Sequence, residues 1–237
     1  MGNVKNLQAF GKLMGYCTGY GGKYNPGQQN LQVNALATLL NNAQQKIHEV
    51  QAARVALDQA KNERAEMHAA MKPLLSRVMN ALKAMQVSKA TLADGRSIVR
   101  SIYANRPLRE PAAAPAETDA AGPKRIARGR DYATRLSNFA HFVRFVEEVP
   151  GYRPNEADLS VQALRDLLAA MRQAHAHVTA SEVQLARSRQ LRDVAMYRGT
   201  ESLVPTALAV KRYVQSVFGN QSAEYRAVGA LPFTNRP

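Results

Sequence analysis

The chain has 237 residues, a hydrophobic content of 46%, an aromatic content of 6%, no tryptophan and a formal net charge of +14. This length is sufficient for one large or two small domains, and a core built mainly from Ala, Leu, Val and Met favours packed helices over a sheet. The single cysteine, Cys17, excludes an internal disulfide and leaves too few thiolates for a zinc or iron–sulfur site.

The positive charge favours a polyanionic partner such as nucleic acid, an anionic membrane face or an acidic protein. The alternative is that arginine only solubilises the helices. Residues 1–16 lack the continuous apolar region of a signal peptide, and no segment approaches the roughly 18 apolar residues of a membrane span. We therefore expect a cytoplasmic protein with no transmembrane segment.

The first predicted helix leads into a glycine-rich segment, GYCTGYGGKYNPG, over residues 15–27. A phosphate-binding loop would need a preceding strand and Gly-Lys-Ser/Thr, whereas here Lys23 is followed by Tyr24. We interpret the segment as a connector in which glycines permit a turn. The helix is predicted because apolar residues recur at helical spacing: Leu7, Phe10, Leu13, Met14 and Cys17.

A long helix is predicted over residues 31–71, because this range contains neither glycine nor proline. Asn30, directly before it, is a favoured N-cap type. Pro73 predicts a break or sharp kink, followed by a further helix over 74–85 and a short final helix; the alternative is a long helix that continues through the kink. Apolar residues in steps of four and three predict helix-to-helix packing: Leu36, Leu40, Ala43, Ile47 and Val50.

Residues 106–131 are predicted to be a linker, because they contain four prolines, many alanines and no apolar periodicity. The linker ends in a basic cluster that is a candidate polyanion-binding site, although a solvated linker end explains it equally well. The cluster consists of Lys124, Arg125, Arg128 and Arg130.

The remainder of the chain repeats the first part. Residues 152–192 align with residues 24–64 without a gap and share 14 identities in 41 positions. Upstream, residues 138–146 face residues 6–14 at a spacing of 132 instead of 128. The second copy again predicts a short helix, an N-cap at Asp158, a long helix, and a break at Gly199 and Pro205. Its first helix carries the apolar residues Phe139, Phe142, Phe145 and Val146.

We therefore predict an all-α protein made by tandem duplication, with helical repeat units at residues 1–105 and 132–237 joined by the linker at 106–131. Each unit is a short helix, a Tyr-x-Pro connector, one long helix and shorter return helices, in a bundle-like or elongated arrangement. The segments at 88–96 and 219–227 are both predicted helix breaks followed by a Thr or Ser N-cap.

The paired polar residues are the candidate sites that the repeat singles out. Tyr24 and Tyr152 stand two residues before Pro26 and Pro154, and a hydroxyl bonded to backbone beneath a turn explains them better than a ligand site. Arg64 and Arg192 are matched near the far ends of the long helices. Pairing with acids is the expected role of these arginines, and contact with a polyanion is the alternative.

No catalytic, cofactor or metal site is predicted. His175 and His177 are two residues apart and point to different sides of a helix, and His48, His68 and His141 have no partner at ligand spacing. Cys17 lies on an apolar helix side, which favours a small buried side chain over a nucleophile.

The sequence favours a non-enzymatic structural or scaffolding protein that self-associates or binds a protein partner, because long helices with heptad-like stripes supply surfaces for assembly. The alternative is sequence-independent binding of nucleic acid or another polyanion through dispersed Arg and Lys. An enzyme with its site between the two repeats is the least supported class.

Overall fold

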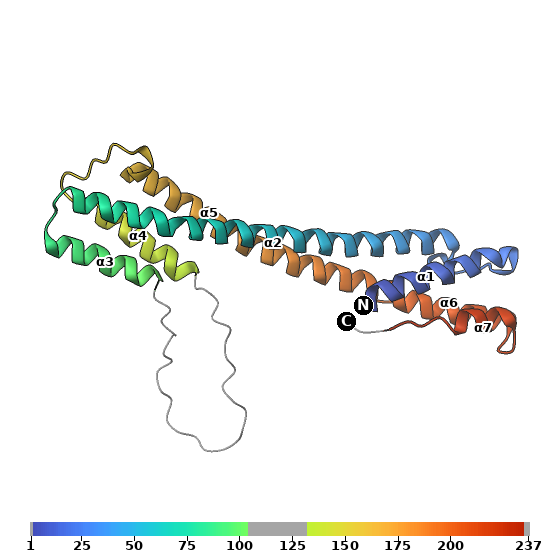
Figure 1. Cartoon of the computed structure of the whole chain (residues 1–237). Helices are drawn as coiled ribbons and strands as arrows, with labels where there is room; N and C mark the ends of the chain where they lie inside the picture. The colour runs from blue at the N-terminus through green and yellow to red at the C-terminus, as the bar shows by residue number, and fades with distance from the viewer. Residues whose placement is uncertain (1, 104–131, 235–237) are drawn as a thin grey trace, which may run out of the picture. The chain divides into compact units, whose positions relative to one another are not determined.

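The computed structural model describes residues 2–103 and 132–234. These residues form seven α-helices, three short 3₁₀ helices (η1–η3) and no strand, which confirms the all-helical prediction (Figure 1). The predicted linker and its basic cluster, Lys124, Arg125, Arg128 and Arg130, lie outside the described residues. The elements are α1 (Gly2–Gly19), η1 (Gly21–Lys23), η2 (Gln29–Leu31), α2 (Val33–Ala84), α3 (Lys89–Tyr103), α4 (Tyr132–Glu148), η3 (Ala157–Leu159), α5 (Val161–Tyr197), α6 (Leu203–Phe218) and α7 (Ala223–Gly229).

The helices form two compact units. Unit 1 consists of residues 1–59 and 180–237, and unit 2 consists of residues 60–179. Each long helix therefore contributes to both units: α2 gives its first part to unit 1 and its last part to unit 2, and α5 does the reverse. The units do not follow the predicted ranges 1–105 and 132–237, because each unit takes the first part of one sequence repeat and the last part of the other.

The core of unit 1 forms where α1 and the start of α2 pack with the end of α5, α6 and α7. Helix α6 lies beside both α1 and α7 (Figure 1). The apolar sides predicted for the first helix and for the start of the long helix pack into this core, which confirms their helical spacing. The fully buried side chains include Phe10, Leu13, Leu36, Met196 and Leu203.

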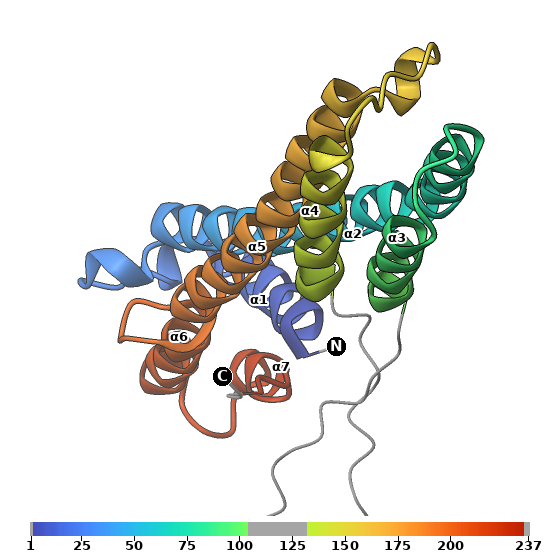
Figure 2. The same cartoon turned by 90° about the vertical axis from the view of Figure 1, so that its left-hand side faces the viewer.

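The core of unit 2 forms between the end of α2, α3, α4 and the start of α5. Figures 1 and 2 both show α3 beside α4. Gly95 permits this close packing, since a Cβ atom there would lie 3.0 Å from both the Met79 thioether and the Phe145 ring. The fully buried side chains include Phe139, Phe142, Leu75, Leu82 and Leu164.

A break at Pro73 is wrong and the alternative of a long helix that continues through the proline holds, because α2 is helical from Val33 to Ala84 and contains Pro73. A proline inside a helix costs about 3 kcal/mol. Burial of Met71, Leu75 and Val78 in the unit 2 core offsets this cost, so tertiary packing overrides the local signal. The predicted break in the second copy is confirmed: α5 ends at Tyr197, and Gly199 has a φ of +88°.

The predicted N-caps at Asn30 and Asp158 are also wrong. Both residues lie within 3₁₀ turns, and the long helices begin three residues later, at Val33 and Val161. Ser160 instead accepts a hydrogen bond on its hydroxyl oxygen from the backbone N–H of Ala163 at 3.2 Å. The carboxylate of Asp158 accepts hydrogen bonds from the guanidinium of Arg77.

The short helices α3 and α7 both begin with a serine cap: Ser222 is a predicted candidate, whereas in the first segment the cap is Ser88 and not Thr91, the residue aligned with Ser222. The backbone N–H of Thr91 donates to the Ser88 hydroxyl at 3.1 Å, and that of Tyr225 donates to the Ser222 hydroxyl at 3.0 Å. Each bond satisfies an N–H group that has no partner inside its own helix. Among the described helices, none combines the length and apolarity that a membrane crossing requires.

Candidate functional site

The two Tyr-x-Pro connectors have the same internal hydrogen bonds. The Tyr24 hydroxyl donates to the Leu31 carbonyl oxygen at 2.7 Å, and the Tyr152 hydroxyl donates to the Leu159 carbonyl oxygen at 2.8 Å. Both rings are buried. Burial raises the pKa of Tyr24 above its ordinary value and that of Tyr152 to about 12, so both hydroxyls remain protonated donors at neutral pH.

The prolines of these connectors lie at the edge of the same cores. Pro26 is buried, and Pro154 is half-buried. Because each tyrosine bonds a carbonyl seven residues ahead, it closes the turn that leads into the following long helix. The geometry assigns the tyrosines to turn closure, with no free hydroxyl left for a ligand.

Cys17 is almost completely buried on α1, with 1% of its surface exposed. Burial raises the pKa of its thiol to about 11, so the side chain is a neutral thiol at physiological pH. The nucleophilic form of cysteine is the thiolate. The environment of Cys17 therefore suits a small packing residue.

The two repeat-matched arginines have different partners. Arg192 donates two hydrogen bonds, at 2.9 and 2.6 Å, to the carboxylate of Asp193. The guanidinium carbon Cζ of Arg64 instead lies 4.1 Å from the centroid of the Tyr132 ring, a cation–π contact. Arg192 therefore has the acidic partner expected from the sequence, and Arg64 has an aromatic one.

Exposed apolar side chains are concentrated in unit 1. Of the nine large apolar residues that are exposed in the described part of the chain, Met85 alone belongs to unit 2. Isolated exposed apolar residues are normal on a protein surface, whereas a group of them indicates an interaction site. The eight in unit 1 are Val4, Tyr16, Val55, Val183, Leu191, Val194, Leu208 and Val217.

Three of these residues form what we call the α5 apolar stripe: Val183, Leu191 and Val194. They are 65%, 41% and 49% exposed. Eleven residues make about three turns of an α-helix, so Val183 and Val194 project from the same side of α5. Leu191, eight residues from Val183, lies about 80° round the helix from it, so the three residues share one broad side of a single helix.

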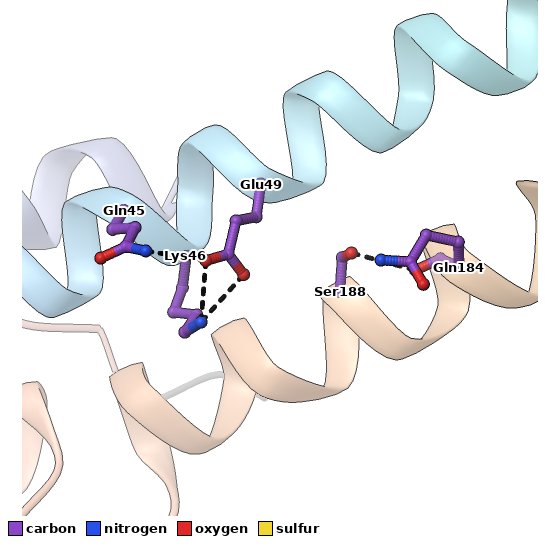
Figure 3. Close-up of polar contacts among 5 residues, drawn as sticks. All are labelled: Gln45, Lys46, Glu49, Gln184 and Ser188. Atoms are coloured by element: carbon purple, nitrogen blue, oxygen red, sulfur yellow. Dashed lines mark hydrogen bonds and ion pairs between the residues drawn. The ribbon is translucent and has the colours of Figure 1, made fainter.

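The buried side of α5 in this segment carries two small polar residues beside one leucine. Ser181, Leu185 and Ser188 are buried, and the Ser188 hydroxyl donates to the Gln184 carbonyl oxygen at 2.9 Å. On the adjacent part of α2, the half-buried Lys46 donates to both carboxylate oxygens of Glu49 at 2.8 and 2.9 Å (Figure 3). Serine thus occupies two of the three buried positions of this segment while Val183, Leu191 and Val194 are exposed.

No family model, curated protein or solved structure matches the chain. The function must therefore be argued from the geometry of its own residues.

No group of three or more His, Cys, Asp or Glu side chains able to hold a metal occurs in the residues that the structure describes. His177 lies 3.7 Å from the carboxylate of Glu63, and both side chains are more than half exposed. His48 and His141 are exposed. His68 and His175 each have a buried Nδ1 atom with no hydrogen-bond partner among the described residues.

Sequence reasoning did not find the α5 apolar stripe. Val183 matches Val55 in the first repeat, but an identity between repeats does not distinguish an exposed valine from a buried one. Both valines are exposed. The signal that could have revealed them is the buried serines, which occupy the heptad positions where a core side chain is expected.

Proposed function

We propose that the protein is a non-enzymatic helical scaffold that binds a protein partner through the α5 apolar stripe of unit 1. The observation that supports this proposal is the exposure of Val183, Leu191 and Val194 on a helix whose buried side carries serine. Leaving valine and leucine in water while burying polar groups costs stability. Such an arrangement is typical of a surface that is covered when a partner binds.

The partner that fits best is an acidic amphipathic helix. The stripe lies on one side of a single helix, so a second helix can lie along it. Unit 1 contains 13 Lys and Arg residues against six Asp and Glu residues, and Arg187 and Arg189 lie within the stripe segment. A second copy of this chain would bring like charges together, whereas acidic residues beside an apolar stripe would complement them.

The test uses the full chain and two synthetic three-heptad amphipathic helices with the same leucines, one with glutamate flanks and one with lysine flanks. We expect the glutamate helix to bind and the lysine helix not to bind, as measured by calorimetry. The double variant Val183→Glu/Val194→Glu should lose this binding. A matched control, Leu208→Glu on α6, should retain it, since Leu208 is exposed but outside the stripe.

Equal binding of both peptides, or retained binding in the double variant, would contradict the proposed partner. Light scattering of the chain alone provides a second check. A mass near 26.0 kDa is expected. A discrete oligomer that the Val183→Glu/Val194→Glu variant converts to a monomer would show instead that the stripe meets a second copy.

The second candidate function is binding to nucleic acid, which the net charge of +14 favours. Such binding would depend on attraction between Lys or Arg and the phosphate backbone, and would not require the α5 apolar stripe. Binding to a duplex oligonucleotide at low salt, lost steeply as salt rises and unchanged in the Val183→Glu/Val194→Glu variant, would support it. No binding at low salt would eliminate it.

A further inference from the structure

A buried polar cluster lies in unit 2, where α2, α3, α4 and α5 meet. Its central residue is His68, which is 6% exposed and whose Nδ1 atom has no hydrogen-bond partner within the described residues. Three other buried polar atoms from the same unit share this property: Arg64 Nε, His175 Nδ1 and the Tyr103 hydroxyl. A buried polar atom without a partner costs about 1–3 kcal/mol, so four of them in one unit require an explanation.

Two of these side chains, Arg64 and His68, contact the same aromatic ring. The Tyr132 ring, at the start of α4, has its centroid 4.1 Å from the Arg64 guanidinium carbon and 4.8 Å from the centroid of the His68 imidazole. Tyr103, the last residue of α3, belongs to the helix packed beside α4 (Figures 1 and 2). The Tyr132 ring therefore joins two of the four side chains whose buried polar atoms have no partner among the described residues.

The surroundings of His68 are cationic. Its pKa is lowered to about 4, first by burial and then by the positive charges of Arg135 and Arg64 and by His175. Arg135 also acts on Tyr103, where it opposes the rise in pKa that burial causes. Among the described residues, the strongest charged neighbours of the His68 imidazole are thus two guanidinium groups.

The matched positions of the other repeat lack this chemistry. At the spacing of 128, His68 aligns with Met196 and His175 aligns with Ile47; at the spacing of 132, Arg135 aligns with Asn3. Arg64 aligns with Arg192, which is neutralised by Asp193. The aligned positions of the other repeat therefore carry no histidine, and the arginine among them is paired with an acid.

We infer that the Arg64–His68–Arg135–His175 cluster of unit 2 is a binding site for a phosphate group. A bound oxyanion would accept hydrogen bonds from the unpartnered guanidinium, imidazole and tyrosine donors, and its charge would balance the two arginines. Phosphate fits better than a carboxylate, since a dianion with several acceptor oxygens matches two cations and three further donors. The inference concerns unit 2 and does not depend on the α5 apolar stripe.

Each residue has a defined role in this site. Tyr132 packs against Arg64 and His68, whose Nε and Nδ1 atoms have no partner among the described residues and would bind the ligand. Arg135 supplies the second cation, and Tyr103 donates from the end of α3. A neutral imidazole can donate from the nitrogen that carries its proton, and a bound dianion would also favour the protonated form of His68.

The test is titration of the full-length protein with inorganic phosphate by calorimetry, at constant ionic strength maintained with chloride. We expect saturable binding that Arg135→Gln and His175→Gln each weaken by about tenfold or more, the amount that loss of one charge-assisted hydrogen bond predicts. Arg192→Gln is the matched control, because it removes the equivalent arginine from unit 1. The affinity of this variant for inorganic phosphate should equal that of the unaltered chain. Circular dichroism establishes that each variant is folded.

A second readout is the pKa of His68, followed by NMR of the imidazole nitrogens. Saturating phosphate should raise this pKa, and the Arg192→Gln variant should behave identically. The absence of saturable binding, equal weakening by Arg192→Gln, or an unchanged pKa of His68 at saturation would each overturn the inference. Titration with O-phosphoserine then distinguishes a phosphate ester from free phosphate as the natural ligand. Tighter binding than that of inorganic phosphate assigns the site to a phosphate ester, and weaker binding assigns it to the free ion.

Discussion

The hydroxyl of Tyr24 donates a hydrogen bond to the carbonyl oxygen of Leu31 at 2.7 Å, and this bond closes the turn that precedes α2. The same bond joins Tyr152 to Leu159 before α5. The backbone bonds around each turn also correspond, with the N–H of Leu31 donating to the Gln28 carbonyl and that of Leu159 to the Glu156 carbonyl. The equivalence of the two turns supports the proposed duplication.

Replacing either tyrosine with phenylalanine should lower the free energy of unfolding by about 1–2 kcal/mol, because a buried carbonyl then loses its partner. The two turns share no partner, so the double variant should lose the sum of the two changes. Urea unfolding at neutral pH measures the effect. Tyr16→Phe is the control, since the Tyr16 side chain is 41% exposed and its replacement should have little effect.

The thiol of Cys17 should be unreactive in the folded protein. Its exposure of 1% and its pKa of about 11 both suppress the thiolate that attacks an aromatic disulfide reagent. We expect modification at least about a hundredfold slower in buffer than in concentrated urea. Equal rates in the two conditions would show that α1 separates from the unit 1 core in the native state.

The mixed composition of the units predicts that neither sequence repeat folds alone. The fragment 1–105 contains half of the unit 1 core and half of the unit 2 core, and the fragment 132–237 contains the complementary halves. Each fragment by itself should therefore show little cooperative thermal unfolding by circular dichroism. Mixing them should restore helicity and yield a one-to-one complex. A fragment that unfolds cooperatively as a monomer would contradict this organisation.

Stability should fall in acid because of His68. Its pKa is lowered from 6.5 to about 4 in the folded chain, so the unfolded state binds the proton more readily over this interval. The stability contributed by the neutral imidazole is fully present above pH 6.5 and is lost as the pH falls toward 4, by up to about 3 kcal/mol.

The variant His68→Met, which carries the side chain found at the matched position 196, removes this titration. Its free energy of unfolding should depend less steeply on pH between 6.5 and 4 than that of the unaltered chain. His48→Gln is the control, because His48 is exposed and its loss should leave the slope unchanged. Equal slopes for His68→Met and the unaltered chain would contradict the assignment.

Local patterns in the sequence were sufficient to predict the helices that are short and well capped. The apolar spacing of Phe10 and Leu13, the serine cap at 222, and Gly199 at the end of α5 all act within a few residues. Some residues of the candidate sites could be predicted from the sequence and others could not. Tyr24 and Tyr152 were visible because they recur, whereas Tyr132, Arg135 and the α5 apolar stripe carry no signal until the helices are packed.

The sequence by itself determined that the chain is helical and that its two parts resemble one another, because periodicity, caps and identities at a fixed spacing are local properties. Tertiary structure decided the rest. Pro73 remains inside α2 because Met71, Leu75 and Val78 are buried in a core completed by the other repeat. The composition of the units and the meeting of Arg64, His68 and Tyr132 likewise depend on contacts between residues far apart in the chain, which no local pattern encodes.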